Sequence, residues 1–543
     1  MSKKLKTKAN SLLSQEKGAV FKDPGGRINI ALCFPNTYSV GMSSLGFQGI
    51  YGFFNRLSDV VCERVFSPDK EDREEYEKSG SEPFSLESKR PLSAFDIIAF
   101  SVSFENDYPN LLKMLKMAKI PLRNSERSSQ YPLVIMGGVC AFYNPEPLAD
   151  FMDVIFIGEA EEMLEEFLSV YRETGARKDL LRNLTAVRGI YLPGFYTVRY
   201  DEAGKIIGRD AAHGVSETIC KRTIKEISRS FLRSTILTPH AEFSNMYLLE
   251  AMRGCPWSCR FCVAGHIYNP PRKKDFAELC TEVKAAVQRT QKVGLIGPSL
   301  SDYPHAEEVL QMEGVDFSIT SLRASPKSIR LVQLMEGHKS ISIAPEAGTQ
   351  RLRNVINKKI TDEDILETAE RILECGIETL RLYFMIGLPT ETWEDIDGMI
   401  DLVKTIRRNT RKGYIRLSVS TFVPKPFTPF QWHPMEPLKS IKEKLQQIKK
   451  GLSRGKGIKV LHDMPKQAHL QGLFALGDRR MGKVLERIAF DDIDVIKKGS
   501  EDLDIASYIY RQKDFSEHLP WDFIDAGVTK EHLWTEYQMA LNG

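Results

Sequence analysis

Short, fully apolar runs alternate with amphipathic stretches over the first third of the chain. The amphipathic stretches are expected to be helices over residues 45–57, 108–118 and 160–173. The apolar runs are expected to be strands over residues 28–34, 96–102, 132–138 and 154–158. Strands that are apolar on both faces and separated by such helices form a parallel sheet covered on both sides. The pattern predicts a doubly wound α/β domain over residues 25–180, after an N-terminal extension over 1–24.

A second series of apolar runs starts near Asn245. Its expected strands cover residues 245–252, 293–297, 317–322, 340–345, 379–387 and 415–423, and a helix-compatible stretch follows each of the first five. Six parallel strands joined by right-handed crossovers would curl into an open TIM-like barrel, with functional loops at the carboxyl ends of the strands. We expect this partial (β/α)6 barrel to span residues 241–435, with residues 181–240 as a bridge.

The chain becomes helical and locally basic after the Pro-rich segment VPKPFTPFQWHP at 423–434. Apolar residues recur at helical spacing on one face, at Ile441, Leu445, Ile448 and Leu452, and lysines fill the other positions. We expect a basic helix over residues 439–459 within a mainly helical region over 436–543. Its lysines could steer RNA toward the barrel, or form an ordinary solvated helix face.

Composition and charge narrow the classes of function only a little. The 75 basic and 72 acidic residues leave a formal charge of +3, too small to indicate a nucleic-acid or membrane partner by itself. The N-terminus lacks the apolar run of a signal peptide, and no later run is long enough to span a membrane. Most of the nine cysteines are scattered singly, as is usual in a reducing compartment. We expect a cytoplasmic protein with no membrane partner.

Three of the cysteines, Cys255, Cys259 and Cys262, lie together in the segment EAMRGCPWSCRFCVAG. The spacing C-x3-C-x2-C on a loop with Gly and Pro lets all three sulfurs point inward, and three soft thiolates suit zinc or an iron-sulfur cluster. His266 is close enough in sequence to complete a zinc site, but no second pair of ligands accompanies the trio. The position just after the first barrel strand favours an iron-sulfur cluster over zinc.

This motif resembles the signature of the radical S-adenosylmethionine (SAM) superfamily, in which an aromatic residue precedes the third cysteine; here it is Phe261. The resemblance implies a 4Fe-4S cluster whose fourth iron stays open for the amino and carboxylate groups of SAM. An electron from the reduced cluster would cleave SAM to a 5'-deoxyadenosyl radical. The resemblance also implies an electron donor such as flavodoxin or ferredoxin, and it assigns no catalytic residue beyond the cluster.

Other segments of the barrel resemble SAM-binding elements of the superfamily. Two arginines near predicted strand ends, Arg323 and Arg381, could pair with the SAM carboxylate or form ordinary structural salt bridges. Glu346 would meet the ribose, or be a carboxylate at a helix N-terminus. The turn that should receive the SAM amino group lacks the usual acidic residue. The expected SAM contacts are Phe261, Gly297, Pro298, Ser299, Glu346, Ile386 and Gly387.

The N-terminal domain resembles the B12-binding domains of one radical SAM subclass, whose fingerprint is D-x-H-x-x-G, then S-x-L, then G-G. Tyr38 stands where the cobalt-ligating histidine would be, so either cobalamin binds without a protein ligand or the domain has lost it. The glycines could instead only allow close backbone approach at strand-helix turns. The expected cobalamin contacts are Asn36, Tyr38, Gly41, Ser101, Ser103, Gly137 and Gly138.

The resemblance covers nearly the whole chain and extends to a bacterial family of this architecture. It implies a radical SAM enzyme that modifies an unidentified substrate, RNA or protein among the candidates, with methyl transfer if cobalamin binds. A methylthiotransferase-like modifier of RNA or protein without cobalamin is one alternative, although the N-terminal cysteine triad of those enzymes is missing. A non-catalytic protein that keeps the cluster as a structural or redox-sensing element is the other.

Overall fold

The computed structural model describes residues 2–319, 321–335, 338–410, 412–501 and 503–542. The chain forms two compact units. The first contains Met1–Leu249, Gly477–Asp504 and Ser516–Gly527, and the second contains Glu250–Leu476, Ile505–Phe515 and Val528–Gly543. Both are built from helices and mainly parallel strands, so the predicted α/β fold class is confirmed. The five predicted domains are a finer division than these units, and their boundaries stay predictions.

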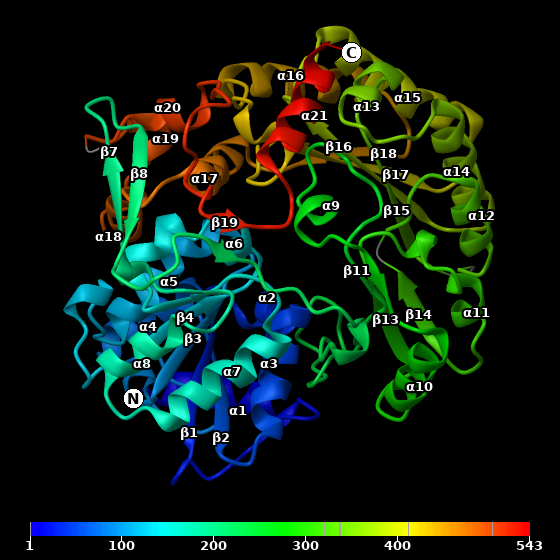
Figure 1. The fold of residues 1–543 in the computed structure, drawn as a ribbon. Coiled ribbons are helices and arrows are strands. Elements are labelled where there is room, and N and C mark those ends of the chain that lie inside the picture. Colours follow the sequence, from blue (N-terminus) through cyan, green and yellow to red (C-terminus); the bar gives the residue numbers. More distant parts are fainter. Residues whose placement is uncertain (1, 320, 336–337, 411, 502, 543) are drawn as a thin grey trace. The chain divides into compact units, whose positions relative to one another are not determined.

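The first unit is built on a six-stranded sheet (Figure 1). The strands are β1 (Ile28–Phe34), β2 (Val60–Phe66), β3 (Ile97–Ser101), β4 (Leu133–Gly137), β5 (Val154–Phe156) and β6 (Ile190–Tyr191). Their order is β2-β1-β3-β4-β5-β6, parallel from β2 to β5, with β6 antiparallel to β5. The first four residues of β3 are all buried, so both faces of the sheet are covered, as the doubly wound prediction requires.

Helices cover this sheet, and a core cluster joins four of them, α2, α3, α7 and α8, to alternate residues of the strands. The helices of the first unit are α1 (Lys3–Ser14), α2 (Tyr38–Met42), α3 (Leu45–Arg56), α4 (Lys70–Ser79), α5 (Tyr108–Met117), α6 (Val139–Tyr143), α7 (Ala160–Glu173), α8 (Arg177–Leu184), α18 (Met481–Phe490) and α19 (Val495–Lys498). The predicted bridge over 181–240 adds a hairpin of β7 (Tyr196–Tyr200) and β8 (Ile206–Ala211). A short strand, β9 (Ile219–Cys220), pairs with β19 (Ile524–Asp525).

Strand β2 is an element that the hydrophobic pattern did not predict. It pairs in parallel with β1 along its whole length. The apolar run is interrupted by a charged pair, Glu63 and Arg64. The strand can still be buried because the Arg64 side chain lies, fully buried, between two carboxylates. The guanidinium contacts both Glu16 and Glu87 at 2.7 Å. A paired buried charge is tolerated where an unpaired one is not.

The second unit contains the predicted partial barrel. After β10 (Tyr247–Glu250), which crosses the boundary between the units, its strands are β11 (Met252–Arg253), β12 (Arg272–Lys273), β13 (Lys292–Ile296), β14 (Asp316–Ile319), β15 (Ser340–Glu346), β16 (Thr379–Ile386), β17 (Tyr414–Thr421) and β18 (Ile458–His462). Strands β13 and β14 pair in parallel, and so do β15 to β18 in sequence order. A parallel bridge between Leu322 and Ile343 joins the two sets. Thr320, within the predicted strand 317–322, lies outside the described residues.

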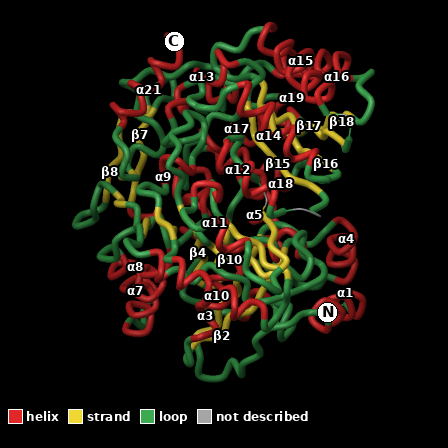
Figure 2. Tube along the Cα trace, turned by 90° about the vertical axis from the view of Figure 1, so that its right-hand side faces the viewer, coloured by secondary structure: helices red, strands yellow, loops and turns green. Residues whose placement is uncertain are grey.

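The helices of the second unit are α9 (Ala264–Ile267), α10 (Phe276–Val287), α11 (Ala306–Leu310), α12 (Pro326–Gln333), α13 (Gln350–Val355), α14 (Asp362–Glu374), α15 (Trp393–Asn409), α16 (Leu438–Leu452), α17 (Pro465–Leu476), α20 (Ile505–Ile509) and α21 (Lys530–Asn542). Figure 1 shows α11, α12, α14 and α15 along the outer side of the strands, and Figure 2 shows the helices and strands from the side. Leu380, Leu382 and Phe384 of β16 are buried, whereas the residues between them are less so. We call the side of the strands that carries the less buried positions the inner face.

The predicted helix over 439–459 is wrong at its C-terminal end. Helix α16 ends at Leu452, and residues Ile458–His462 form β18, which extends the barrel sheet beside β17. Gly457, with φ of 78°, lies between the two elements in a conformation that other residues rarely adopt. Two of the lysines assigned to the basic helix, Lys456 and Lys459, therefore lie outside it.

No helix in the described stretches of the chain combines the length and the hydropathy needed to cross a membrane.

Candidate functional site

The three clustered cysteines lie on the loop between β11 and α9. Gly254, directly before Cys255, has φ of 81°, and a Cβ at this position would lie 2.3 Å from the carbonyl oxygen of Tyr268. Only glycine lets the loop pack this closely on the chain that returns from α9. Cys259 is buried, and Cys255 and Cys262 are half-buried, as is Phe261. The loop thus presents three thiols in a sheltered place after the first strands of the barrel.

His266, the expected fourth ligand of a zinc site, is held by the backbone of the cysteine loop. The Nε2 atom of His266 lies 3.3 Å from the carbonyl oxygen of Cys259, so this ring is tied to the backbone of the loop. Burial lowers the pKa of His266. Among the described residues, no three His, Cys, Asp or Glu side chains converge closely enough to hold one metal ion. A zinc site requires such convergence, whereas each thiolate of an iron-sulfur cluster binds its own iron.

Two cations, Arg323 and Lys358, surround Cys259. Burial raises the pKa of the Cys259 thiol, and the positive charges of Lys358 and Arg323 oppose that rise. Burial also raises the pKa of Cys255, and raises that of Cys262 to about 11. Metal ligation requires thiolates, so positive charge beside the buried sulfur favours a bound anionic cluster.

A polar network joins the cysteine loop to the turn after β13. The indole Nε1 of Trp257 donates to Asp302 Oδ2 at 2.6 Å, and the hydroxyl of Ser299 donates to the same oxygen at 2.7 Å. Gly297 packs against β11, where a Cβ would lie 2.3 Å from Met252 Cγ, and Pro298 is exposed. The predicted turn at 297–299 therefore has an acidic neighbour, Asp302, which lies three residues after Ser299.

The segment after α13 fixes the other side of the cysteine loop. The backbone N–H of Arg260 donates to Ile356 O at 3.0 Å, and its guanidinium donates to Glu536 at 3.0 Å. The amide of Asn357 donates to Ser258 O at 2.9 Å. Sequence reasoning missed Ile356, Asn357 and Glu536 because none of them belongs to a motif, and only the fold brings them next to residues 258–260.

Glu346 ends β15 in a left-handed conformation, with φ of 68°. Such a φ is uncommon for a residue other than glycine, and strain of this kind is often found at functional sites. The Glu346 carboxylate lies 3.1 Å from Lys358 Nζ, the same ammonium group that affects Cys259. Glu346 therefore lies next to the cysteine cluster, as expected for a residue that contacts a ligand bound there.

The end of β16 holds Ile386 and Gly387, both of which are buried. The Gly387 N–H donates to Glu391, and the Ile386 carbonyl accepts from the N–H of Phe422 at 2.9 Å. Gly387 has φ of 81°. The Gly387 N–H and the Ile386 carbonyl thus already have hydrogen-bond partners. An adenine ring at this turn would therefore be held by van der Waals contact and by the Gly387 carbonyl. The buried Glu391 lies against Lys444, and burial raises its pKa to about 7.

In the first unit, the loops after β1, β3 and β4 meet at the carboxyl edge of the sheet. The strand order reverses between β1 and β3, which is where ligands bind in open α/β sheets. The Asn36 amide donates to Asp107 Oδ1 at 2.8 Å, joining the β1 loop to the start of α5. Gly138, with φ of 108°, packs so closely on the β3 loop that a Cβ would lie 2.3 Å from Val102 O. Ser101 and Gly137 are opposite each other in register, and Ser103 is exposed.

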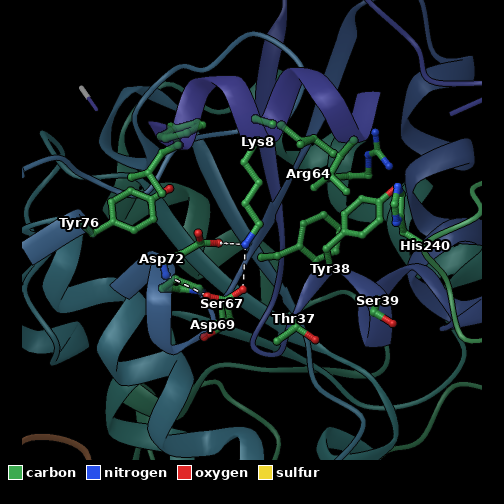
Figure 3. A pocket seen from close by; sticks show the side chains of 17 residues that line it. Lys8, Thr37, Tyr38, Ser39, Arg64, Ser67, Asp69, Asp72, Tyr76 and His240 are labelled. Atoms are coloured by element: carbon green, nitrogen blue, oxygen red, sulfur yellow. Dashed lines mark hydrogen bonds and ion pairs between the residues drawn. The ribbon is translucent and has the colours of Figure 1, made fainter. Parts of the chain in front are cut away.

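The Tyr38 side chain lies apart from these loops. It faces a pocket of about 420 Å³ that is lined by α1, the end of β2 and the start of α4 (Figure 3). Its hydroxyl contacts Glu16 at 2.5 Å and Thr238 at 3.0 Å. The other expected cobalamin contacts do not line this pocket. Gly41 has a packing role, because a Cβ there would lie 2.6 Å from the Phe66 ring. The structure thus brings Asn36, Ser101 and Gly138 together at the switch point, with the Tyr38 side chain held apart.

Two segments of the chain match two family models. Residues 46–193 match the model described as radical SAM proteins, N-terminal, and residues 249–403 match that of the radical SAM superfamily. The second match contains the cysteine loop and the strands up to β16.

Several proteins are similar in sequence. An uncharacterized protein of Methanocaldococcus jannaschii, MJ0966, is 30% identical over 466 residues, which is 84% of this chain and 90% of that one. A tRNA-2-methylthio-N(6)-dimethylallyladenosine synthase of Desulforamulus reducens is 25% identical over 184 residues, 30% of this chain and 40% of that one. The ribosomal protein uS12 methylthiotransferase RimO of Thermoanaerobacter sp. is 23% identical over 340 residues, 56% of this chain and 74% of that one.

A solved structure of the cobalamin-dependent SAM radical enzyme OxsB aligns with 95% of this chain and 79% of its own, at 13% identity and a TM-score of 0.46. A likeness at this score carries no weight for fold or function.

Proposed function

The chain belongs to the radical SAM superfamily, and from this membership we propose that it cleaves SAM reductively at a 4Fe-4S cluster held by Cys255, Cys259 and Cys262. The resulting radical would modify a carbon of the substrate. One observation carries the proposal: three thiols lie on one sheltered loop, with Arg323 and Lys358 beside the most buried of them. This donor set fits a cluster with one iron left open, because the loop supplies no fourth ligand.

When bound, the reduced cluster supplies the electron that breaks the sulfonium bond of SAM. The chain's own residues have three tasks around it. The cysteine loop must stay closed, and contacts from Trp257 and Arg260 to the neighbouring segments hold it. Cations must balance the negative charge of the thiolates, which Arg323 and Lys358 do. Water must be excluded from the radical, and the burial of Cys259 contributes to that.

SAM would be positioned by groups at the ends of three strands. Asp302 takes the place of the acidic residue that the turn at 297–299 lacks, and its carboxylate would accept a hydrogen bond from the SAM amino group. Glu346 would accept hydrogen bonds from the ribose hydroxyls, since its left-handed backbone turns it away from an ordinary strand path. The Gly387 turn would carry the adenine. Each role is supported by proximity to the cysteine loop or by position at a strand end.

We further propose that the first unit binds cobalamin at the switch point of its sheet, which would make the reaction a methyl transfer. The support is the meeting of Asn36, Ser101 and Gly138 at the edge where open α/β sheets bind ligands. Cobalamin, when bound, would supply the methyl group. Tyr38 would not be its cobalt ligand, because the hydroxyl is taken by Glu16 and Thr238.

The alternative of a methylthiotransferase is favoured by the names of the more distant relatives. The cysteines of the first unit argue against it. Cys33, Cys62 and Cys140 are completely buried on β1, β2 and α6, and burial raises the pKa of the first two thiols. These three cysteines lie on three different elements, and in the described parts of the chain they form no metal-ligand group. A second cluster would need a different arrangement.

The electron donor would be a small redox protein such as flavodoxin or ferredoxin, and the compartment the cytoplasm. None of the nine cysteines, all of which lie in the described parts of the chain, forms a disulfide, which suits a reducing compartment.

The test is anaerobic reconstitution followed by dithionite and SAM, with 5'-deoxyadenosine and S-adenosylhomocysteine as readouts. The proposal expects 5'-deoxyadenosine from the wild type and none from Cys259→Ala. A Cys280→Ala variant, which changes a cysteine on α10 outside the loop, should retain the activity. A fully loaded wild-type cluster that forms neither product would overturn the proposal.

A further inference from the structure

Three basic side chains lie in register on the inner face of the barrel sheet. Arg381 on β16 pairs with Arg416 on β17, and Arg416 pairs with Lys459 on β18. Partner residues on neighbouring parallel strands point to the same side of the sheet, about 4.8 Å apart. Arg381 is half-buried, and Arg416 and Lys459 are exposed. We call these three residues the basic row.

The basic row has no acidic partner among the described residues. Within the described parts of the chain, none of the three side chains forms an ion pair, and the Nε of Arg381 is buried without a hydrogen-bond acceptor. The inward residues of the next strand, Ser340 and Ser342 on β15, are uncharged. Three like charges at strand spacing repel one another, and a buried donor without an acceptor costs free energy. A bound anion would relieve both.

A second row, which carries one aromatic and one aliphatic side chain, lies two residues nearer the carboxyl ends of the same strands. Tyr383, Ser418 and Leu461 are in register, and Tyr383 and Leu461 are 37% and 41% exposed. Exposed aromatic and aliphatic side chains beside a set of cations suit a ligand with a planar or apolar body and an anionic end. The body would lie toward the cysteine loop, and the anionic end away from it.

The position and the width of the basic row indicate the size of the ligand. The three residues lie one or two positions from the amino ends of their strands, and Arg381 lies five positions, roughly 16 Å, from the carboxyl end of β16. The backbone of a nucleic acid would need an extended line of cations, whereas three cations side by side over about 10 Å suit the terminal group of a small molecule. Three positive charges match a phosphate or pyrophosphate group better than a single carboxylate.

We propose that Arg381, Arg416 and Lys459 form an anion-binding site on the inner face of the barrel, and that the substrate is a small molecule with a phosphate or pyrophosphate group. The anion site rests on the geometry of the sheet alone. Only its assignment to the substrate rests on the proposed function.

The test is calorimetric titration of the reconstituted full-length protein with inorganic pyrophosphate under anaerobic conditions. We expect one site per chain, and an affinity at least about tenfold weaker in Arg416→Gln and in Lys459→Gln, because each removes a charge-assisted hydrogen bond. Arg330→Gln is the matched control. It removes an arginine whose side chain is 75% exposed on α12, and it should bind pyrophosphate as the wild type does.

Absent pyrophosphate binding, or equal affinity in the wild type and both row variants, would overturn the site. A loss of SAM affinity in the row variants, without any pyrophosphate binding, would assign the basic row to SAM. This result would also overturn the proposed pyrophosphate site. The small-molecule claim would be overturned if an RNA oligonucleotide displaced pyrophosphate from the wild type and bound more weakly to the row variants. Failure of the proposed function looks different: 5'-deoxyadenosine would be missing while pyrophosphate still bound.

Discussion

The guanidinium of Arg323 lies over the ring of Trp257, 3.7 Å from its centroid. Trp257 belongs to the cysteine loop, whereas Arg323 follows β14. The same guanidinium donates to the carbonyls of Lys358 and Lys359 after α13. One side chain therefore holds three segments together around the thiols.

Replacing Arg323 by Gln should destabilise the second unit. The variant loses the cation–π contact and the hydrogen bonds to two carbonyl oxygens, together about 2 kcal/mol of the free energy of unfolding. Urea denaturation of the metal-free protein measures this loss. The control is Arg330→Gln, and equal midpoints for the two variants would show that Arg323 does not hold the loop.

Gly138 to Ala should destabilise the first unit strongly. Its φ of 108° suits glycine alone, and the new Cβ would meet the carbonyl oxygen of Val102 at 2.3 Å. We expect the free energy of unfolding, measured by urea denaturation, to fall by about 3 kcal/mol. Gly175→Ala is the control, because a Cβ there meets nothing within 4 Å. Equal stability of the two variants would contradict the close approach of the β3 and β4 loops.

The sequence predicted most of the sheet strands because their apolar runs are uninterrupted. Strand β2 was missed because its charged pair resembles a surface segment, and the partners that neutralise Arg64 are distant in sequence, at Glu16 and Glu87. Strand β18 was missed because it is polar and partly exposed, so its residues read as the continuation of a basic helix. In both cases the deciding partner is brought close only by the fold.

The cysteine trio could be found from spacing alone, but its surroundings could not. Asp302 and Lys358 belong to no motif, and they reach the loop because parallel strands end at one edge of the sheet. The basic row was equally hidden, since Arg381, Arg416 and Lys459 are related by strand register and not by spacing.

Asp107 should make the stability of the first unit depend on pH. Burial raises the pKa of its carboxyl from 3.8 to about 6. Between these values the folded protein holds more protons than the unfolded one, so the free energy of unfolding falls as the pH rises from about 4 to about 6.

An Asp107→Asn variant removes this dependence. Its free energy of unfolding relative to the wild type, measured by urea denaturation, should rise by at most about 3 kcal/mol between pH 4 and pH 7. The slope is about 1.4 kcal/mol per pH unit. The control Asp179→Asn, at an exposed site on α8, should follow the wild type. A constant difference between Asp107→Asn and the wild type across this pH range would contradict the assignment.

Glu346→Gln should weaken SAM binding and leave the cluster intact. The change keeps the size of the side chain but removes the charge that faces Lys358 at 3.1 Å. We expect a Kd for SAM about tenfold higher, and an unchanged iron content after reconstitution. Glu367→Gln, at an exposed position of α14, is the control. Loss of iron with unchanged SAM affinity would assign Glu346 to the cluster instead.

The central claim is that three cysteines hold a cluster with one iron open to SAM. The most direct measurement is the electron paramagnetic resonance spectrum of the dithionite-reduced protein before and after SAM is added. The account predicts a cluster signal that SAM changes in the wild type, and no such signal in Cys255→Ala, Cys259→Ala or Cys262→Ala. A signal that SAM leaves unchanged, or one that persists in these variants, would contradict it.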